Sequence, residues 1–404
     1  MKKYLNNWFT LAALVIWFSY PAQAQNSANL SPTIGHSKAP LFSTKEKIVF
    51  NLNTNFTDLW KHRAIANQEV PEDIRDFEAP GRLAWTDRTG KHDLPVKVEL
   101  RGNTSQSASE CPFPKMSLSF EKDQATGERV SKGTLFDGLN SIGIGTHCGG
   151  KLGSSPRFRR VWGGLSPHRE ALIYKVQEYL SIPGFQVFPA SFSYIDANTG
   201  KGPVEPQPSG FAVNQPMPGF FLEDIKTFVK QADGKEIRAA DAPFPDSDKP
   251  YIFTSITDAP KDARAAGSVI EPIDAKNIIR IMFFQALVGN RDWIIRISPD
   301  DLSASRGLWN MKVVEAEGKW IVFPYDYDLA GWVKSENFFS GLPGLADGDF
   351  YKPADISQVV AELRQKRPGI EALVDGLARE DRDGASRIKA HIKSFYNALD
   401  RRFH

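Results

Sequence analysis

The stretch that decides the organisation of this chain is DAKNIIRIMFFQALVGNRDW, residues 274–293. Between Ile278 and Val288 its apolar side chains fall on nearly every face of a helix, which is too many for a helix at a protein surface. We therefore predict a central helix in the second half of the chain. The polar sequence NRDW, residues 290–293, follows at once, so a polar loop leaves a buried element.

The first half of the chain, ahead of this helix, has the patterns of strands. Val96–Leu100 alternates apolar and charged side chains, as a half-buried strand does. One helix is expected among the strands, capped by Ser166, with Pro167 in its first turn and an end at Pro183. After the central helix, helical spacing returns from Asp355 to His404. Further strands are predicted at 48–52, 82–85, 115–120, 188–195 and 219–225.

The expected fold class is α+β, with a β-rich N-lobe and a mainly helical C-lobe. A chain of 404 residues exceeds a typical single core, which favours two lobes. Composition shifts predict a signal peptide at 1–24, a flexible lead-in at 25–45, a β-rich N-lobe with one helix at 46–230, an irregular insertion or boundary at 231–271, and a helical C-lobe at 272–404.

The start of the chain has the pattern of an export signal. Lys2 and Lys3 precede an apolar run from Trp8 to Tyr20, and residues 21–24, PAQA, form an Ala-x-Ala cleavage site. An apolar core of about a dozen residues is shorter than the roughly 20 that span a bilayer. We predict cleavage after Ala24, a periplasmic or secreted protein, and no stable membrane span after cleavage; an uncleaved anchor is the alternative.

Charge argues against a nucleic-acid partner. The chain has 50 Lys and Arg against 48 Asp and Glu, and removal of Lys2 and Lys3 with the leader leaves a neutral mature chain. Proteins that bind nucleic acid through phosphates need a basic excess or a basic stripe. No such stripe occurs in the sequence.

The two cysteines, Cys111 and Cys148, are expected to form a disulfide, because an exported protein matures in an oxidising compartment. The bridge would close a loop of about 36 residues, worth on the order of 3 to 4 kcal/mol in the chain-entropy model. Two free thiols are the alternative. A zinc site has less support, because His147 alone does not complete a tetrahedral ligand set.

A sparse set of polar residues follows the central helix and suits phosphoryl transfer. Asp292 is an acid that can orient a hydroxyl, Asn310 is an amide, and Asp326 and Asp328 are acids that can hold a divalent metal. Transfer of a γ-phosphoryl group needs mainly metal charge and positioning, which this set can supply. The structural alternatives are a polar loop that ends a helix and two caps at a strand end.

Six motifs in order resemble the spore coat protein H (CotH) type of secreted atypical protein kinase, across most of residues 95–331. They are RGNTS (101–105), PKMSL (114–118), a helix beginning Arg169-Glu170, GFFLE (219–223), NRDW (290–293) and PYDYD (324–328). The resemblance implies a two-lobed kinase-like fold that binds ATP with magnesium (Mg2+) or manganese (Mn2+). It also implies transfer of the γ-phosphoryl group to a hydroxyl of a protein or cell-envelope acceptor.

The same resemblance assigns roles to individual residues. Lys115 reaches the ATP phosphates and Glu170 orients it, whereas a solvated lysine and a helix-dipole glutamate are the structural alternatives. Glu223 lies in the segment between the lobes that meets adenine. The remaining roles are a turn over the nucleotide for Arg101, Gly102 and Asn103, catalysis for Asp292 with Asn290 holding its loop, and metal binding for Asn310, Asp326 and Asp328.

The chain departs from the family pattern between Asp292 and Asn310, where an insertion contains SPDD at 298–301. A pseudokinase-type binding protein of the cell envelope is therefore the alternative function. A metal-dependent hydrolase using Asp292, Asp326 and Asp328 has less support. A Ser-His-Asp hydrolase has little, because the sequence contains no Gly-x-Ser-x-Gly elbow.

Overall fold

The computed structural model describes residues 36–63, 77–102, 111, 113–145, 165–203, 216–237, 274–295, 308–316, 319–334, 339, 341–343 and 352–403. Contacts group residues 32–404 into one unit and set residues 1–31 apart. All described residues belong to the larger unit, so the predicted signal peptide lies outside them. None of the described helices is long and apolar enough to cross a membrane.

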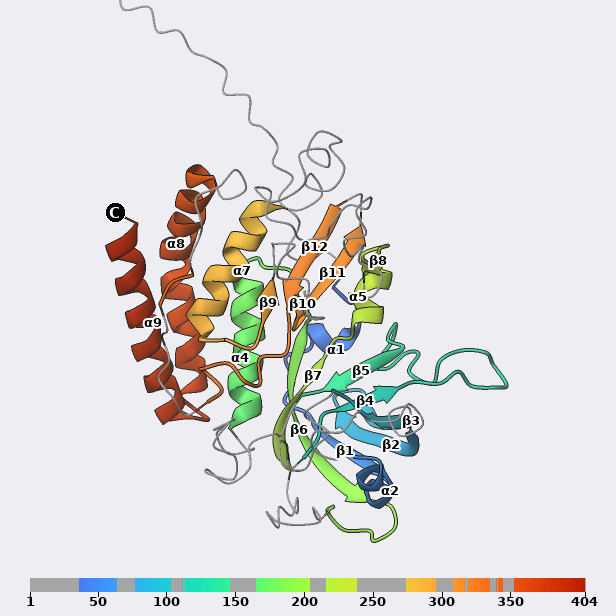
Figure 1. Cartoon of the computed structure of the whole chain (residues 1–404). Helices are drawn as coiled ribbons and strands as arrows, with labels where there is room; N and C mark the ends of the chain where they lie inside the picture. Colours follow the sequence, from blue (N-terminus) through green and yellow to red (C-terminus); the bar gives the residue numbers. More distant parts are fainter. Residues whose placement is uncertain are drawn as a thin grey trace, which may run out of the picture. The chain divides into compact units, whose positions relative to one another are not determined.

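Seven strands of the first half close into a mixed β-barrel (Figure 1). Its strands follow one another around the barrel in the order β1-β2-β3-β4-β5-β7-β6. The pair β1–β6 is parallel and closes the barrel, and every other neighbouring pair is antiparallel. The strands are β1 (Val49–Thr54), β2 (Glu78–Asp87), β3 (Gly90–Leu100), β4 (Met116–Ser119), β5 (Ser141–Ile144), β6 (Val187–Asp196) and β7 (Met217–Leu222).

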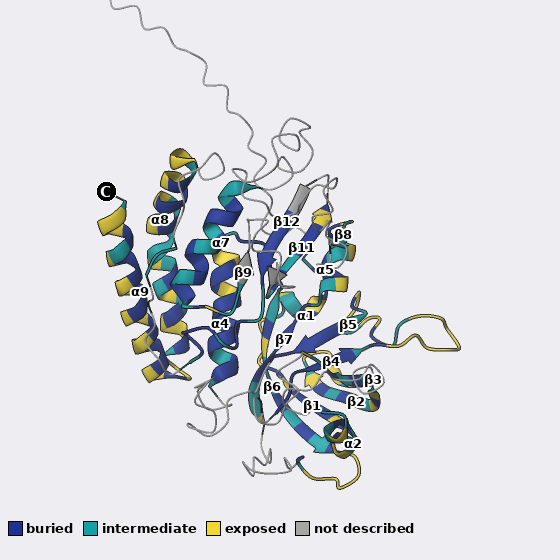
Figure 2. Cartoon of the chain, viewed as in Figure 1, coloured by how far each residue is buried: buried dark blue, intermediate teal, exposed yellow. Residues whose placement is uncertain are grey.

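Aromatic rings fill the interior of the barrel. Phe50 lies at the centre, with its ring centroid 4.9 Å from that of Phe221 and 5.7 Å from that of Trp85. Figure 2 shows buried residues along the barrel strands, interspersed with intermediate and exposed ones. The alternation predicted from the sequence explains the packing: in β3 the side chains of Leu94, Val96, Val98 and Leu100 point inward while the residues between them are more exposed.

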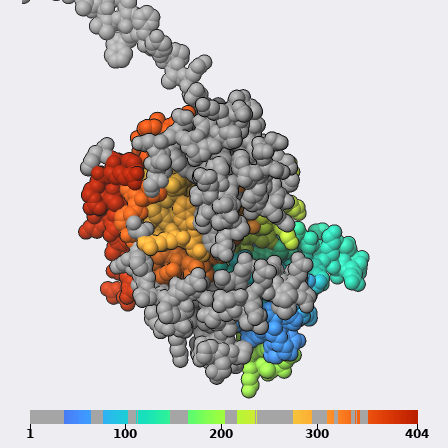
Figure 3. Space-filling view, in the orientation of Figure 1, coloured from blue at the N-terminus to red at the C-terminus, as the bar shows by residue number. Residues whose placement is uncertain are grey.

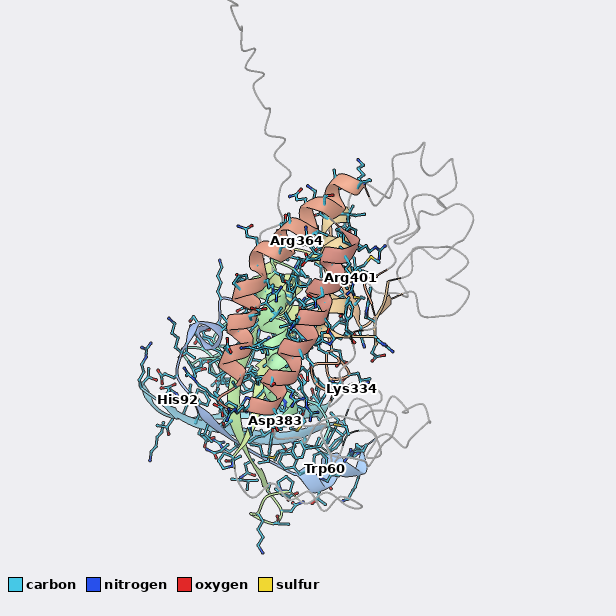
Figure 4. The ribbon with its side chains drawn as sticks, turned by 90° about the vertical axis from the view of Figure 1, so that its left-hand side faces the viewer. Trp60, His92, Lys334, Arg364, Asp383 and Arg401 are labelled. Atoms are coloured by element: carbon cyan, nitrogen blue, oxygen red, sulfur yellow. The ribbon has the colours of Figure 1, made fainter. Side chains whose placement is uncertain are left out.

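Helix α4 (Ser166–Tyr179) packs against β6 and β7 on one side and against α8 (Pro353–Leu377) on the other. Helix α7 (Ala275–Val288) is the predicted central helix, capped by Asp274 and ended by Gly289 in the left-handed conformation. It packs on α8 and on α9 (Arg382–Arg402). Figure 4 shows α8 and α9 side by side, where Arg364 of α8 bonds Asp400 of α9 at 2.9 Å.

Two small sheets complete the second half. Strand β11 (Met311–Ala316) pairs with β12 (Lys319–Pro324) and with β8 (Lys235–Ile237), and both pairs are antiparallel. Strands β9 (Ile294–Ile295) and β10 (Leu308–Trp309) pair just after the central helix. The connection between β4 and β5 projects from the barrel (Figures 1 and 3). The remaining helices are α1 (Pro40–Ser43), α2 (Phe56–Lys61) and α5 (Ile225–Gln231).

The α+β class is confirmed, as a seven-stranded mixed barrel followed by C-terminal helices. Several boundaries differ from the sequence prediction. The strand predicted to Ile225 ends at Leu222, because the Asp224 side chain accepts from the N–H of Thr227 and caps α5. Ser166 is not a cap but the first residue of α4, whose N-cap position is Leu165.

The predicted domain limits also differ from the structure, because segments predicted to be flexible or irregular contain a helix or a strand. Residues 36–45 of the predicted lead-in include α1, and Leu41 is fully buried. The predicted insertion at 231–271 includes β8, which is part of the sheet with β11. The predicted N-lobe with one helix contains α2 and α5 besides α4.

Candidate active site

Lys115, next to β4, is the centre of a buried ion cluster. Its Nζ forms an ion pair with Asp326 and lies 3.4 Å from Oδ2 of Asp328. The lysine side chain is 6% exposed. The strand ladder continues to Lys115, because its carbonyl accepts a hydrogen bond of 2.9 Å from the N–H of Arg101. The lysine therefore points from the barrel to a loop 211 residues further along the chain.

Asp326 and Asp328 lie in a turn just after β12, which ends at Pro324. Asp326 has a φ of +64°, in the left-handed region that non-glycine residues seldom adopt. Its N–H donates to the hydroxyl of Tyr174 on α4 at 3.1 Å. The turn brings both carboxylates to Lys115.

Helix α4 contributes Glu170, which is 2% exposed and lies within electrostatic reach of Lys115, Asp326 and Asp328. Burial raises the pKa of Glu170 to about 8, although the charge of Lys115 acts in the opposite direction. Its Oε2 has no hydrogen-bond partner within the described part of the chain. Glu170 is therefore a buried carboxyl group whose ionisation depends on what binds beside it.

Lys115 itself stays charged. Burial lowers its pKa, but the carboxylates of Asp326 and Asp328 raise it by more, and the result lies above the ordinary value. Arg101 adds a second cation, whose charge acts on both Lys115 and Glu170. A Cβ on Gly143 of β5 would lie 2.6 Å from Nη1 of Arg101, so a larger residue there would displace this guanidinium. Two cations and three carboxyl groups thus converge from four segments of the chain.

A second group of polar residues lies at the end of α7. The Asn290 side chain accepts from the N–H of Asp292 at 3.0 Å and thereby holds the predicted catalytic loop. The amide nitrogen of Asn310 donates to the Asp292 carbonyl at 2.6 Å and to its Oδ2 at 3.1 Å. The Asn310 carbonyl accepts from the N–H of Tyr325, the residue before Asp326. Asp292 is thus oriented on both sides and tied to the turn that carries the cluster.

The donor set suits a hard divalent cation. Asp326 and Asp328 offer carboxylate oxygens. Asn310, which lies between β10 and β11, offers the oxygen of its side-chain amide. Magnesium is usually held by one or two protein carboxylates together with substrate phosphates. Within the described residues there is no group of three or more acidic, histidine or cysteine side chains that holds a metal by itself. Phosphate oxygens would have to complete the coordination.

Some predicted residues lie apart from this cluster or outside the described residues. Glu223 follows β7, which has a partner strand on each side, so it is not on an edge strand. Its carboxyl group accepts from the N–H of Ser37 at 2.7 Å and of Gln186 at 3.1 Å, and burial raises its pKa to about 8. These bonds tie the first described segment to β6.

Gly102 has a φ of +85°, in accord with a turn that requires glycine. Asn103 lies outside the described residues. Cys111 is buried and its sulfur is in a disulfide. Cys148, the other cysteine of the sequence, lies outside the described residues.

Sequence reasoning missed three residues that shape the site: Tyr174, Gln177 and Gly143. The spacing of Tyr174 and Gln177 from Glu170 places all three on one face of the helix, which is a signal for the two residues. Gly143 belongs to SIGIG, residues 141–145, and glycine inside a strand is a signal of close backbone or side-chain approach.

The sequence matches no protein-family model, and comparisons with curated proteins and with solved structures gave no match either. The resemblance drawn from the six motifs therefore stays a prediction. Function has to be argued from the site, since a fold alone does not imply an activity.

Proposed function

We propose that the chain is a two-lobed, kinase-like phosphotransferase that moves the γ-phosphoryl group of ATP to a hydroxyl acceptor with a divalent metal. One observation carries the proposal: Lys115, Glu170, Asp326 and Asp328 converge, although they come from separate segments of the sequence. These are the residue types that hold nucleotide phosphates and a metal in kinases. The barrel would be the N-lobe and the C-terminal helices the C-lobe.

Each residue of the site has a distinct task in this proposal. Lys115 and Arg101 offer positive charge to the phosphates, and Glu170 lies beside Lys115 to keep it in place. Asp326 and Asp328, with Asn310, hold magnesium or manganese, which neutralises charge on the phosphate oxygens. A cation bound there has to share these carboxylates with Lys115, which now contacts both.

Asp292 is assigned to the acceptor. Its carboxylate takes or orients the proton of the attacking hydroxyl, and Asn310 fixes the carboxylate through Oδ2. Asn290 holds the loop through the N–H of Asp292. The export signal predicted from the sequence supports an acceptor on a protein or another cell-envelope molecule, reached in the periplasm or after secretion.

Calorimetry of ATP binding to the purified protein, with and without magnesium, tests this proposal. We expect wild type to bind ATP more tightly with the metal, and Asp326→Asn to lose most of that gain because it removes the negative charge of a metal ligand. Asp93→Asn is the matched control, since Asp93 pairs with Arg82 at 2.9 Å on the exposed face of β3. If wild type binds no nucleotide under any metal condition, the proposal fails.

The pseudokinase-type binding protein remains the second candidate, and one observation favours it. Lys115 already contacts both acids, and Asn310 already contacts Asp292, so these five residues have partners within the fold. A scaffold that had lost its nucleotide would keep such an ion cluster for structure. Binding of ATP without transfer to any protein or envelope fraction would support this second function.

A further inference from the structure

One face of α4 carries three polar side chains into the interior. Glu170, Tyr174 and Gln177 are four and three residues apart, which places them one above another on a helix. Each is at most 2% exposed. A buried polar group lowers stability unless it is hydrogen-bonded. The hydrogen-bond partners of these side chains therefore indicate the role of this face of α4.

Tyr174 bonds the turn that carries the acids. Its hydroxyl accepts from the N–H of Asp326 at 3.1 Å, at the residue with a left-handed backbone. Its ring contacts that of Tyr327 at a centroid distance of 4.8 Å, so the hydroxyl is held by packing as well. Because the left-handed conformation is costly for an aspartate, the turn needs an outside contact to favour it.

Gln177 bonds both ends of the same turn. Its amide nitrogen donates to the carbonyl of Pro324 at 3.1 Å and to that of Pro183 at 2.7 Å. Its amide oxygen accepts from the hydroxyl of Tyr327 at 2.7 Å. The turn from Pro324 to Asp328 is therefore attached to α4 at three points: Pro324, Asp326 and Tyr327.

We propose that Tyr174 and Gln177 are positioning residues that set the place of Asp326, and that α4 thereby holds Glu170 and the acid-bearing turn as one body. Neither residue touches the phosphates or the acceptor in this scheme. They act through the backbone of the turn, so the two carboxylates and Glu170 keep a fixed arrangement around Lys115. The link to metal and nucleotide rests on the proposed function, but the attachment of the turn does not.

Hydrogen exchange of the peptide 324–328 tests the attachment directly. Tyr174→Phe keeps the ring and removes the hydroxyl, and Gln177→Met keeps the length and removes the amide. We expect the exchange of this peptide to become faster by at least about tenfold in each variant, because Tyr174→Phe removes one buried hydrogen bond to the turn and Gln177→Met removes two. The matched control is Tyr396→Phe, which removes the hydroxyl that donates to the Leu363 carbonyl at 2.8 Å, between α8 and α9.

The second measurement is the gain in ATP affinity that magnesium provides. We expect Tyr174→Phe and Gln177→Met to lower it by about tenfold and Tyr396→Phe to leave it unchanged, at similar thermal stability. Exchange at 324–328 equal to that of wild type in both variants overturns the proposal, and so does faster exchange with the metal-dependent gain intact. If wild type binds no ATP, the proposed function fails, and the exchange data alone decide whether α4 holds the turn.

Discussion

Two lysines on neighbouring parts of the barrel each face two carboxylates, yet their surroundings differ. Lys97 of β3 lies 3.2 Å from Glu78 and 2.8 Å from Glu121, and its side chain is 41% exposed. Lys115 faces Asp326 and Asp328 with a side chain that is 6% exposed. The partners of Lys97 are Glu78 at the start of β2 and Glu121 just after β4. The partners of Lys115 lie more than 200 residues further along the chain, where Asp326 is 211 residues from the lysine.

The difference in burial shows that the cluster at Lys115, and not the one at Lys97, requires an explanation by function. An exposed ion pair is screened by water and contributes little to stability, so the cluster at Lys97 is an ordinary feature of a strand surface. Burial of ions has a desolvation cost that mutual attraction often fails to repay. In the cluster at Lys115 the side chains of Lys115, Glu170 and Asp328 are buried, while Asp326 and Arg101 are partly exposed. The fold therefore keeps buried ionisable groups in an arrangement that stability alone does not favour.

The largest expected effect separates the two lysines. Lys115→Met should lower phosphoryl transfer by at least about a hundredfold, because a cation that faces the phosphates is lost. It should also lower the free energy of unfolding by about 3 to 5 kcal/mol, because buried carboxylates are left without their cation. Rates of transfer and denaturant unfolding measure the two effects.

Lys97→Met is the control for this comparison, and both properties should stay close to those of wild type. Equal losses in the two variants would mean that burial and position of the lysine do not matter. A loss of stability in Lys115→Met without any transfer in wild type would assign the cluster a structural role.

The next effect concerns chemistry rather than binding. Asp292→Asn should lower phosphoryl transfer by about a hundredfold, because the carboxylate can no longer take the hydroxyl proton. ATP affinity should stay unchanged, since the proposed function assigns Asp292 to the acceptor hydroxyl and not to the nucleotide. Transfer rates and calorimetry on the same preparation measure both. A parallel loss of ATP affinity would place Asp292 with the metal ligands instead.

The buried carboxyl group of Glu223 extends the comparison to the dependence of stability on pH. Burial raises the pKa of Glu223 to about 8 against hydrogen bonds that lower it, and the Asp224 charge raises it further. The folded chain thus keeps a proton that the unfolded chain releases above about pH 4.5. This contribution to stability is complete below that pH and is lost as the pH rises through about 8.

We therefore expect the free energy of unfolding to fall by about 2 kcal/mol between pH 6 and pH 7.5, at roughly 1.4 kcal/mol per pH unit for one proton. Glu223→Gln should have a flatter pH profile over this interval, because glutamine does not titrate. Denaturant unfolding at several pH values measures it. A profile as steep as that of wild type would contradict the assignment to Glu223.

The smallest expected effect comes from a substitution that changes no charged residue. Gly143→Ala should weaken ATP binding by about tenfold, because a Cβ 2.6 Å from Nη1 of Arg101 displaces the guanidinium. The control is Gly376→Ala in α8, where a Cβ has nothing within 4 Å. Calorimetry measures both variants. Unchanged affinity in Gly143→Ala would remove Arg101 from the group of residues that face the phosphates.

Local patterns were enough to predict most elements of the fold. The alternation of β3, the apolar α7 and its ends at Asp274 and Gly289 follow from side-chain periodicity and capping, which act over a few residues. The closure of seven strands into a barrel was not predicted, because the parallel pair of β1 and β6 joins segments far apart in sequence. The cap at Asp224 was missed for a different reason, since an apolar run concealed it.

Part of the candidate site could be proposed from the sequence, because Asp292, Asn310, Asp326 and Asp328 have a chemical rationale in phosphoryl transfer. Lys115 and Glu170 were proposed only through the resemblance to a family. The arrangement of these residues could not be predicted. The left-handed turn at Asp326 depends on a hydroxyl from α4, and the contact of Lys115 with two acids depends on the approach of the barrel to the turn after β12. The sequence by itself determined which side chains are available and which helices and strands carry them, because those choices are made by neighbours along the chain. Only the tertiary structure decided which charges meet and which are removed from water, since burial and long-range contacts exist only after the segments have packed.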